Sequence, residues 1–173
     1  MKLFLTGNPG VGKTTVIRVI AHRLKSVSCA GFYTEEIRQS GERIGFRIVT
    51  LDGEAATLAS VGTGKPTVGK YSIHIEEFEN LVLRHVDMLA TPADLYIVDE
   101  IGKMELLSGR FRNKIIELLG QPINLLATLS KKGDGLIDQI RRRRDVEIIE
   151  VTRKNRDELP DELLRKIYAI KPQ

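Results

Sequence analysis

A glycine-rich stretch near the amino terminus has the residue types and spacing needed to hold phosphate groups. The stretch "GNPGVGKTT" contains the spacing Gly-x-x-x-x-Gly-Lys-Thr. In this signature, backbone N–H groups surround the phosphates of a nucleoside triphosphate, the lysine reaches the β and γ oxygens, and the hydroxyl binds Mg²⁺. The predicted nucleotide contacts are Gly7, Asn8, Pro9, Gly10, Val11, Gly12, Lys13, Thr14 and Thr15. We therefore expect Lys13 to be catalytic and Thr14 to be a Mg²⁺ ligand; Thr15 is either a second loop hydroxyl or a residue of the first helical turn.

A pair of acids later in the chain supplies the second half of such a site. Asp99 and Glu100 follow the apolar run "LYIV", which is typical of a buried parallel strand. Open α/β sheets bind ligands at the carboxyl ends of their strands, so we expect Asp99 to contact the metal. Glu100 is predicted to be the general base that activates a water molecule for attack on the γ-phosphate. The alternative for Glu100 is a solvated loop acid.

A phosphate loop needs a strand before it and a helix after it, and the sequence provides both. The predicted strands are 2–6, 29–37, 43–51, 55–58, 68–73, 94–100, 123–130 and 146–151, and the predicted helices are 14–25, 75–89, 111–119, 136–143 and 159–170. Strands and helices in alternation indicate an α/β fold with a mainly parallel central sheet. The strands 29–37 and 43–51 flank the turn "RQSGE" and predict an antiparallel hairpin at one edge. We expect a single domain over 1–173.

Composition limits the partners that the chain can have. The 27 Lys and Arg residues against 23 Asp and Glu give a net charge of +4, which suits an anionic ligand without demanding nucleic acid. No apolar run approaches the roughly 20 residues that span a bilayer. The single cysteine, Cys29, cannot form an internal disulfide and is expected to be a buried thiol. We expect a monomer in the cytoplasm that binds nucleoside triphosphates, with no membrane partner and no nucleic acid.

Three polar residues in strand-like segments have two readings each. If strand 123–130 lies between the two motif strands, Thr128 faces the γ-phosphate or the attacking water; otherwise it is a strand residue with a bonded hydroxyl. Glu35 and Glu36 end the strand that contains "GFYT". Side-chain alternation puts these two acids on opposite faces, so at most one should point at the site.

Basic residues elsewhere also leave alternatives open. Lys103 lies close enough to the acidic strand to touch a phosphate, and otherwise forms a surface ion pair. Residues 152–157, "TRKNRD", follow the last strand, so Asn155 or Arg156 could contact the base. The run "RRRR" at 141–144 closes a helix and lacks interleaved aromatic residues, which disfavours nucleic acid. One of its arginines could instead act in catalysis.

Several segments together resemble one family. "GNPGVGKTT", "GFYTEEIRQSGERIGFRIVTL", "VDEIGKMEL" and "NRDELPDELL", in this order, are similar to the small nucleoside-triphosphatase family of thermophilic archaea and bacteria, whose animal member is the cancer-related nucleoside-triphosphatase. The resemblance covers nearly the whole chain. The sequence departs from it at "TLS", where family members often read "TIP", which leaves the loop 130–134 undefined.

The resemblance implies a three-layer P-loop NTPase fold of the RecA-like kind, with another strand inserted between the two motif strands. It also implies slow, Mg²⁺-dependent hydrolysis of nucleoside triphosphates to the diphosphate and phosphate, with broad base selectivity. By the same resemblance, a second set of nucleotide contacts is expected at Leu95, Tyr96, Ile97, Val98, Asp99, Glu100, Ile101 and Gly102.

Two other classes of function share the phosphate loop. A phosphotransferase acting on a nucleoside, a nucleotide or a nucleic-acid end would need an arginine-rich lid, which 141–144 could supply. A nucleotide-dependent switch would use hydrolysis to time a partner contact, and the hairpin 31–51 would be its surface. The sequence contains no obvious arginine finger, so slow turnover is expected under the leading interpretation.

Overall fold

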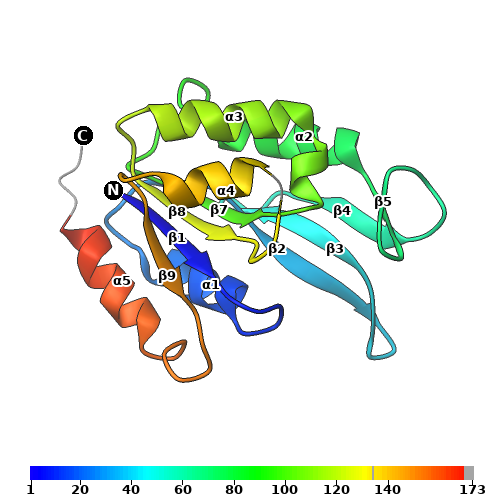
Figure 1. The fold of residues 1–173 in the computed structure, drawn as a ribbon, viewed down its shortest axis with the longest axis horizontal. Helices are drawn as coiled ribbons and strands as arrows, with labels where there is room; N and C mark the ends of the chain where they lie inside the picture. The colour runs from blue at the N-terminus through cyan, green and yellow to red at the C-terminus, as the bar shows by residue number, and fades with distance from the viewer. Residues whose placement is uncertain (134, 170–173) are drawn as a thin grey trace.

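The computed structural model describes residues 1–133 and 135–169 and contains one nine-stranded sheet (Figure 1). The strand order is β5-β6-β4-β3-β2-β7-β8-β1-β9. The strands are β1 (Lys2–Thr6), β2 (Cys29–Gln39), β3 (Glu42–Thr50), β4 (Ala55–Val61), β5 (Thr67–Val68), β6 (Tyr71–Ile73), β7 (Leu95–Ile101), β8 (Leu125–Leu129) and β9 (Glu147–Glu150). Asp134, the last residue of the undefined loop 130–134, and Ile170, the last residue of the predicted final helix, lie outside the described residues.

The parallel half of the sheet runs from β2 to β9. β2 pairs in parallel with β7, β7 with β8, β8 with β1, and β1 with β9. β8 therefore lies between the strand that leads into the glycine loop and the strand that carries the acidic pair, as the family resemblance implied. Because these strands are parallel, their carboxyl ends meet along one edge of the sheet, which we call the phosphate edge.

The other half of the sheet is antiparallel and begins within β2. Residues 29–32 of β2 pair with β7, and residues 32–39 pair with β3 in the opposite sense. β3 pairs with β4, β4 with β6, and β6 with β5, all antiparallel. We call the segment 33–73 the antiparallel extension. The predicted antiparallel hairpin beside parallel strands is confirmed, but the antiparallel part is larger than predicted and equals the parallel part in the number of strand pairs.

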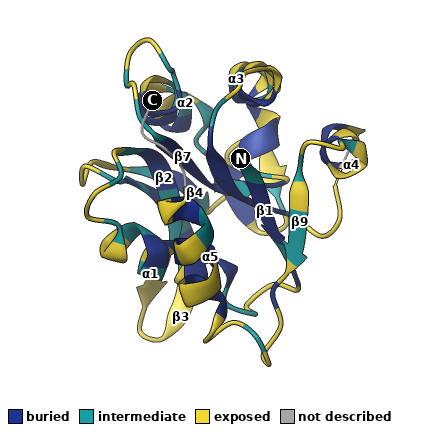
Figure 2. Ribbon diagram, turned by 90° about the vertical axis from the view of Figure 1, so that its left-hand side faces the viewer, coloured by how far each residue is buried: buried dark blue, intermediate teal, exposed yellow. Residues whose placement is uncertain are grey.

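Helices cover both faces of the sheet, which gives three layers (Figures 1 and 2). The helices α1 (Lys13–Arg23) and α5 (Leu159–Tyr168) pack on one face, and α2 (Ile75–His85), α3 (Gly109–Gly120) and α4 (Gly135–Arg142) pack on the other. Alternate residues of the central strands serve the two layers: Phe4 belongs to the core under α2 and α3, whereas Leu3 and Leu5 belong to the core under α1. Figure 2 shows these central strands as the most buried part of the molecule.

The structure departs from the predicted elements in several places. α2 ends at His85 rather than at residue 89, because the Asp87 carboxylate accepts hydrogen bonds from the N–H groups of Leu89 and Ala90 and forms a turn. The predicted strand 68–73 is two short strands with a turn between them, where Gly69 has φ +60°. A 3₁₀ turn, η1 (Glu105–Leu107), follows β7 and was not predicted.

Ser108 determines where the next helix starts. Its hydroxyl accepts a hydrogen bond of 2.9 Å from the N–H of Phe111, so α3 begins at Gly109, two residues before the predicted start. Serine at this position satisfies an N–H that the first helical turn leaves without a partner. η1 and this cap together fix the chain that leaves the phosphate edge.

Within the described ranges, no helix combines the length and the apolar character needed to cross a bilayer.

Candidate functional site

The glycine loop turns tightly between β1 and α1. Gly7 has φ +152°, and a Cβ added there would lie 2.7 Å from the carbonyl oxygen of Val151, which follows β9. Any other residue would therefore clash with backbone. Gly12 has φ +112° and ends the loop as the N-cap of α1, where its carbonyl accepts the N–H of Val16 at 3.0 Å. The loop is thus shaped by backbone constraints that require glycine, and it presents the amino terminus of α1 to the phosphate edge.

Lys13 lies at the centre of the phosphate edge. Its side chain is buried, and its Nζ lies 3.4 Å from the Gly7 carbonyl oxygen and 4.0 Å from Oε2 of Glu100. The ammonium group is therefore folded back over the loop and directed toward the acidic end of β7. A cation in this position meets any phosphate that enters the loop.

Asp99 is completely buried and is held by three neighbouring threonines. Its Oδ1 accepts a hydrogen bond of 2.6 Å from the Thr128 hydroxyl, and its Oδ2 accepts one of 3.2 Å from the Thr34 N–H. Burial raises the pKa of Asp99, and hydrogen bonds from Thr128 and Thr14 oppose that rise. The hydrogen bond to Thr14 brings the two predicted metal ligands together. Oxygen donors of this kind fit Mg²⁺.

Glu100 follows Asp99 but faces a different environment. About a third of its side chain, 32%, is exposed, and Lys13 is its nearest cation. Burial and the neighbouring Asp99 raise the pKa of Glu100, whereas Lys13 lowers it. Glu100 therefore combines an accessible carboxylate with increased basicity, as a general base requires.

A cavity of about 780 Å³ joins these groups. Its lining includes Pro9, Gly10, Gly12, Lys13, Thr14, Thr15, Thr34, Glu35, Glu36, Glu100, Lys103, Glu105 and Ser130. Both the glycine loop and the end of β7 thus open onto one space, together with the first residues of the antiparallel extension. A smaller cavity of about 340 Å³ borders the outer side of the loop, between Asn8 to Val11 and the residues after β9.

Most of the nucleotide contacts expected along β7 lie in the core of the sheet instead. Leu95 and Ile97 pack under α1, and Tyr96 and Val98 pack on the opposite face, so these four form the sheet core and do not line the cavity. Strand β7 supports the site through its last residues only. Ile101 is likewise fully buried in the core, and Gly102 follows the strand end.

Glu35 and Glu36 both line the cavity, which extends along β2 beyond the point where β7 stops pairing with it. That at most one of them points at the metal stays a prediction. Glu35 pairs with Arg18 at 3.2 Å and with Arg47 at 2.7 Å. Glu36 forms similar pairs with arginines of its own hairpin. Both carboxylates are therefore engaged by arginines.

Thr128 of β8 and Arg156 of the turn after β9 also contact the site. Thr128 lies on β8 between the motif strands, as expected, but its hydroxyl donates to Asp99. Arg156 lies across the loop: its Nη1 is 3.4 Å from the Val11 carbonyl, and its Cδ is 3.4 Å from a Cβ added at Gly12. Asn155 instead bonds the backbone of its own turn, at Glu150 and Thr152.

Three site residues were not found in the sequence. Thr34 binds Asp99 twice, through its N–H and through a hydroxyl that donates to the Asp99 carbonyl at 2.5 Å. Lys131 lies beside the loop, with its Nζ 3.4 Å from Asn8 Oδ1 and 2.9 Å from Glu150 Oε1. Glu105 is a buried acid next to Glu100. The repetition of acids in "DEIGKMEL" is the one sequence signal that pointed to Glu105.

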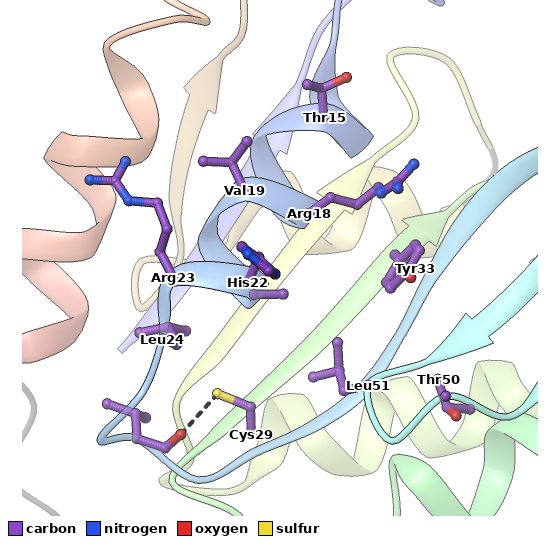
Figure 3. Close-up of a pocket in the computed structure, with 13 residues that line it drawn as sticks. Thr15, Arg18, Val19, His22, Arg23, Leu24, Cys29, Tyr33, Thr50 and Leu51 are labelled. Atoms are coloured by element: carbon purple, nitrogen blue, oxygen red, sulfur yellow. Dashed lines mark hydrogen bonds between the residues drawn. The ribbon is translucent and has the colours of Figure 1, made fainter.

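A larger cavity, about 890 Å³, lies on the other side of α1, away from Lys13 and Glu100 (Figure 3). Thr15 and Arg18 line both cavities, and the Arg18 guanidinium lies over the Tyr33 ring at 5.3 Å. Cys29 is half-buried rather than buried, and its thiol donates to the Val27 carbonyl at 3.4 Å. Burial raises the pKa of Cys29 to about 11, so the thiol stays protonated.

A sheet covered on both faces, whose parallel half has a glycine loop after its first strand and an acidic strand end two strands away, defines a P-loop NTPase fold. A family model described as NTPase matches residues 2–164, and the chain belongs to that family.

Relatives from distant organisms match nearly the whole chain. Nucleoside-triphosphatase THEP1 from Thermotoga sp. (strain RQ2) is 43% identical, over 95% of this chain and 94% of its own length. The cancer-related nucleoside-triphosphatase of Homo sapiens is 42% identical, over 92% of this chain and 93% of its own length. The crystal structure of THEP1 from Aquifex aeolicus superposes with a TM-score of 0.88 at 36% identity, and covers 96% of this chain and 99% of that chain. The family resemblance seen in the sequence is confirmed.

Proposed function

We propose that this chain hydrolyses nucleoside 5′-triphosphates to the diphosphate and phosphate with Mg²⁺ as cofactor. One observation carries the proposal: the buried Lys13 ammonium lies 4.0 Å from the Glu100 carboxylate, at the rim of a single cavity beside Asp99. A phosphate-binding cation and a carboxylate base therefore face the same space. The relatives named above as nucleoside-triphosphatases support the same reaction.

Each residue at the phosphate edge has a separate part in the proposed reaction. Loop amides and Lys13 hold the β- and γ-phosphates, and Glu100 accepts a proton as the oxygen of a water molecule bonds to the γ-phosphorus. The bond from the γ-phosphorus to the bridging oxygen breaks, and the diphosphate leaves with that electron pair. Thr14 and Asp99 would hold Mg²⁺, which neutralises phosphate charge when bound. Thr128 and Thr34 keep the Asp99 carboxylate in place for this contact.

We propose slow turnover, because the arginines around the cavity are neutralised by acids. Arg18 pairs with Glu35, and Arg38 and Arg43 pair with Glu36. An arginine finger contributes roughly 10³- to 10⁵-fold to phosphoryl transfer in enzymes that have one. Among the described residues, the arginines that line this cavity are paired with acids, so we expect the site to forgo that acceleration.

We propose broad base selectivity and a single catalytic domain. The segment 152–157 beside the loop offers Arg156 but contains no aromatic residue on which one base would stack in preference to another. One sheet runs through the described ranges, from β1 to β9, which supports a single domain. A monomer in the cytoplasm, without a nucleic-acid or membrane partner, remains our expectation.

Phosphate release from ATP, GTP, CTP and UTP with Mg²⁺ tests the proposal. We expect all four to be hydrolysed at similar rates, and Glu100→Gln to reduce kcat by roughly 10²-fold or more while nucleotide binding persists. The matched control is Glu76→Gln, which makes the same change on the exposed face of α2. Undiminished release by Glu100→Gln would remove Glu100 from the role of base.

Two of the four arginines that could form a phosphotransferase lid are engaged elsewhere. Arg141 donates hydrogen bonds to the carbonyl oxygens of Ser130 and Lys131, and Arg143 pairs with Asp145 at 2.8 Å. These two arginines hold their own segment and are not free to act as a lid. Phosphate release from ATP alone should therefore equal release in the presence of nucleosides and nucleoside monophosphates.

A further inference from the structure

The two ends of the phosphate site differ in what surrounds them. Lys13, which reaches the β and γ oxygens in this signature, lies 4.0 Å from Glu100, so the γ-phosphate end of the site is the end beside β7. The α-phosphate and the nucleoside extend the other way, past the amino terminus of α1 at Gly12. A side chain that contacts the nucleoside must therefore lie beside this second end of the loop.

Arg156 crosses the loop at that end. Its Nη1 lies 3.4 Å from the Val11 carbonyl oxygen, and a Cβ added at Gly12 would lie 3.4 Å from its Cδ. The stem of the side chain thus runs across Gly12, and the guanidinium group lies over the loop. The carboxylate of Asp157 is 3.5 Å away and belongs to a side chain that is 84% exposed, so this ion pair holds the arginine weakly.

The turn that carries Arg156 is braced by Asn155. The Asn155 side chain accepts hydrogen bonds from the N–H and the hydroxyl of Thr152, at 2.8 Å and 3.1 Å, and donates one of 2.9 Å to the Glu150 carbonyl. The N–H of Arg156 bonds the Thr152 carbonyl at 3.1 Å, and α5 begins at Leu159. The backbone under Arg156 is therefore fixed, whereas its partly exposed guanidinium group is open to a ligand.

Arg18 also lies near this end of the loop, on another side of α1, and is held more tightly. Its guanidinium group pairs with Glu35 at 3.2 Å and lies over the Tyr33 ring at 5.3 Å. Figure 3 shows the Arg18 side chain extending from α1 toward Tyr33, beside the larger cavity. Glu35 is 16% exposed, so this ion pair is better shielded from solvent than the pair of Arg156 with Asp157. The contacts that Arg156 gives up on meeting a ligand are the weaker ones.

We propose that Arg156 contacts the nucleoside of a bound triphosphate, with the plane of its guanidinium group against the base. This role rests on the proposed function, because it requires a triphosphate in the loop. A guanidinium group is planar, stays charged and stacks on the π-face that every nucleobase has. Such a contact distinguishes poorly among bases, which fits the broad selectivity proposed above. Arg156 touches no reacting atom in this role, so it acts on binding and leaves kcat unchanged.

Binding of the non-hydrolysable analogue adenylyl imidodiphosphate with Mg²⁺, measured by calorimetry, tests this role without turnover. We expect Arg156→Ala to raise the dissociation constant roughly 10-fold, because a stacked side chain contributes about that much to binding a base. Arg156→Lys keeps the charge but loses the plane, and should lose nearly as much. The matched control is Lys154→Ala, which removes an exposed charge from the same turn and should bind as the unmodified chain does.

Inorganic tripolyphosphate separates the nucleoside from the phosphates. It has three linked phosphate groups but no sugar or base, so Arg156→Ala should weaken its binding by less than about 2-fold in physiological salt, which screens charges that are not in contact. Steady-state phosphate release should show KM raised about 10-fold for ATP, GTP, CTP and UTP alike, with kcat unchanged, since KM approaches the dissociation constant when chemistry is slow.

Three results would overturn the proposal: Arg156→Ala binds the analogue normally, Arg156→Lys restores full binding, or tripolyphosphate loses as much as the nucleotide. A larger loss for Arg18→Ala than for Arg156→Ala would place the nucleoside in the cavity of Figure 3 and overturn it as well. Thermal melting checks that each variant folds, and Arg156→Lys tests the same contact should Arg156→Ala not fold.

Failure of the proposed function gives a different result. If the unmodified chain binds the analogue but releases no phosphate from the four triphosphates, hydrolysis is wrong, and the binding data alone decide the Arg156 contact. If the unmodified chain releases phosphate and Arg156→Ala binds the analogue normally, only the Arg156 contact is wrong.

Discussion

Charged side chains follow opposite rules in the two halves of the sheet. At the phosphate edge, Lys13, Asp99 and Glu105 are buried, and the nearby acids Glu100 and Asp99 raise the pKa of Glu105 further. In the antiparallel extension, Glu36 and Arg43 are substantially exposed and pair directly at 2.7 Å. The charged groups at the phosphate edge are thus available to a ligand, whereas those of the antiparallel extension neutralise one another in ion pairs.

The pKa directions express the same difference. Burial raises the pKa of Asp99, Glu100 and Glu105. Hydrogen bonding to Arg43 lowers the pKa of Glu36, although partial burial opposes it. Raised pKa values mean that burial at the phosphate edge disfavours the ionised form of these acids. Such perturbation is a mark of functional sites, and paired surface charges are mainly structural.

Removing a cation from each region should give the largest contrast. Lys13→Ala is expected to reduce phosphate release by roughly 10³-fold, because the loop loses the charge that stabilises the transferring phosphoryl group. Lys70→Ala removes the same charge from the exposed β5–β6 turn and should leave turnover unchanged. Steady-state phosphate release measures both. Equal losses would mean that net charge, and not position, governs the reaction.

Titration of Glu105 should give the next largest effect, on stability. Its pKa is about 8 in the folded chain against 4.5 for a free glutamate, so the folded state holds the proton more tightly. Stability is then fully present below about pH 4.5 and falls as the pH rises toward 8, by at most about 1.4 kcal/mol per unit. Denaturant unfolding without nucleotide at pH 5 and pH 8 measures this fall.

Glu105→Gln is the matched variant for that measurement, since it cannot ionise. We expect the unmodified chain to lose more stability than Glu105→Gln between these two pH values. Asp99 and Glu100 remain in both proteins and cancel from the comparison. The same pH dependence in both would show that Glu105 does not titrate in this range.

Removing a hydrogen bond from the buried Asp99 should have an intermediate effect. Thr128→Val keeps the shape of the side chain but takes away the hydroxyl that donates to Oδ1 at 2.6 Å. An unsatisfied buried acceptor costs about 1–3 kcal/mol, so the free energy of unfolding should fall by that amount. Thr128→Ser retains the hydroxyl and should lose less. A stable Thr128→Val variant would contradict the holding role of Thr128.

The smallest effect is expected in the antiparallel extension. Glu36→Gln breaks pairs that are more than a third exposed, and such pairs contribute about 0–1 kcal/mol. Denaturant unfolding at low and high salt should show a difference that shrinks as salt screens the charges. A loss as large as that of Thr128→Val would show that the extension does depend on its ion pairs.

Much of the fold could be predicted because its signals are local. The run "LYIV" identifies a buried strand, and the spacing of "GNPGVGKTT" fixes a loop whose glycines serve backbone geometry. Element ends were predicted less well, because they depend on single hydrogen bonds such as those of Asp87 and Ser108. Alternation along β2 did not reveal that the cavity extends past the pairing with β7, so that both Glu35 and Glu36 line it.

The sequence by itself determined the phosphate loop, the acidic strand end and the α/β class, since each is encoded within a few consecutive residues. Only the tertiary structure decided which side chains surround Asp99 and Glu100. Thr34 of β2 and Thr128 of β8 bond Asp99 from the two strands that flank β7, so their meeting depends on this strand order. The raised pKa of Glu105 likewise comes from burial, and a residue is buried only after the rest of the chain has packed around it.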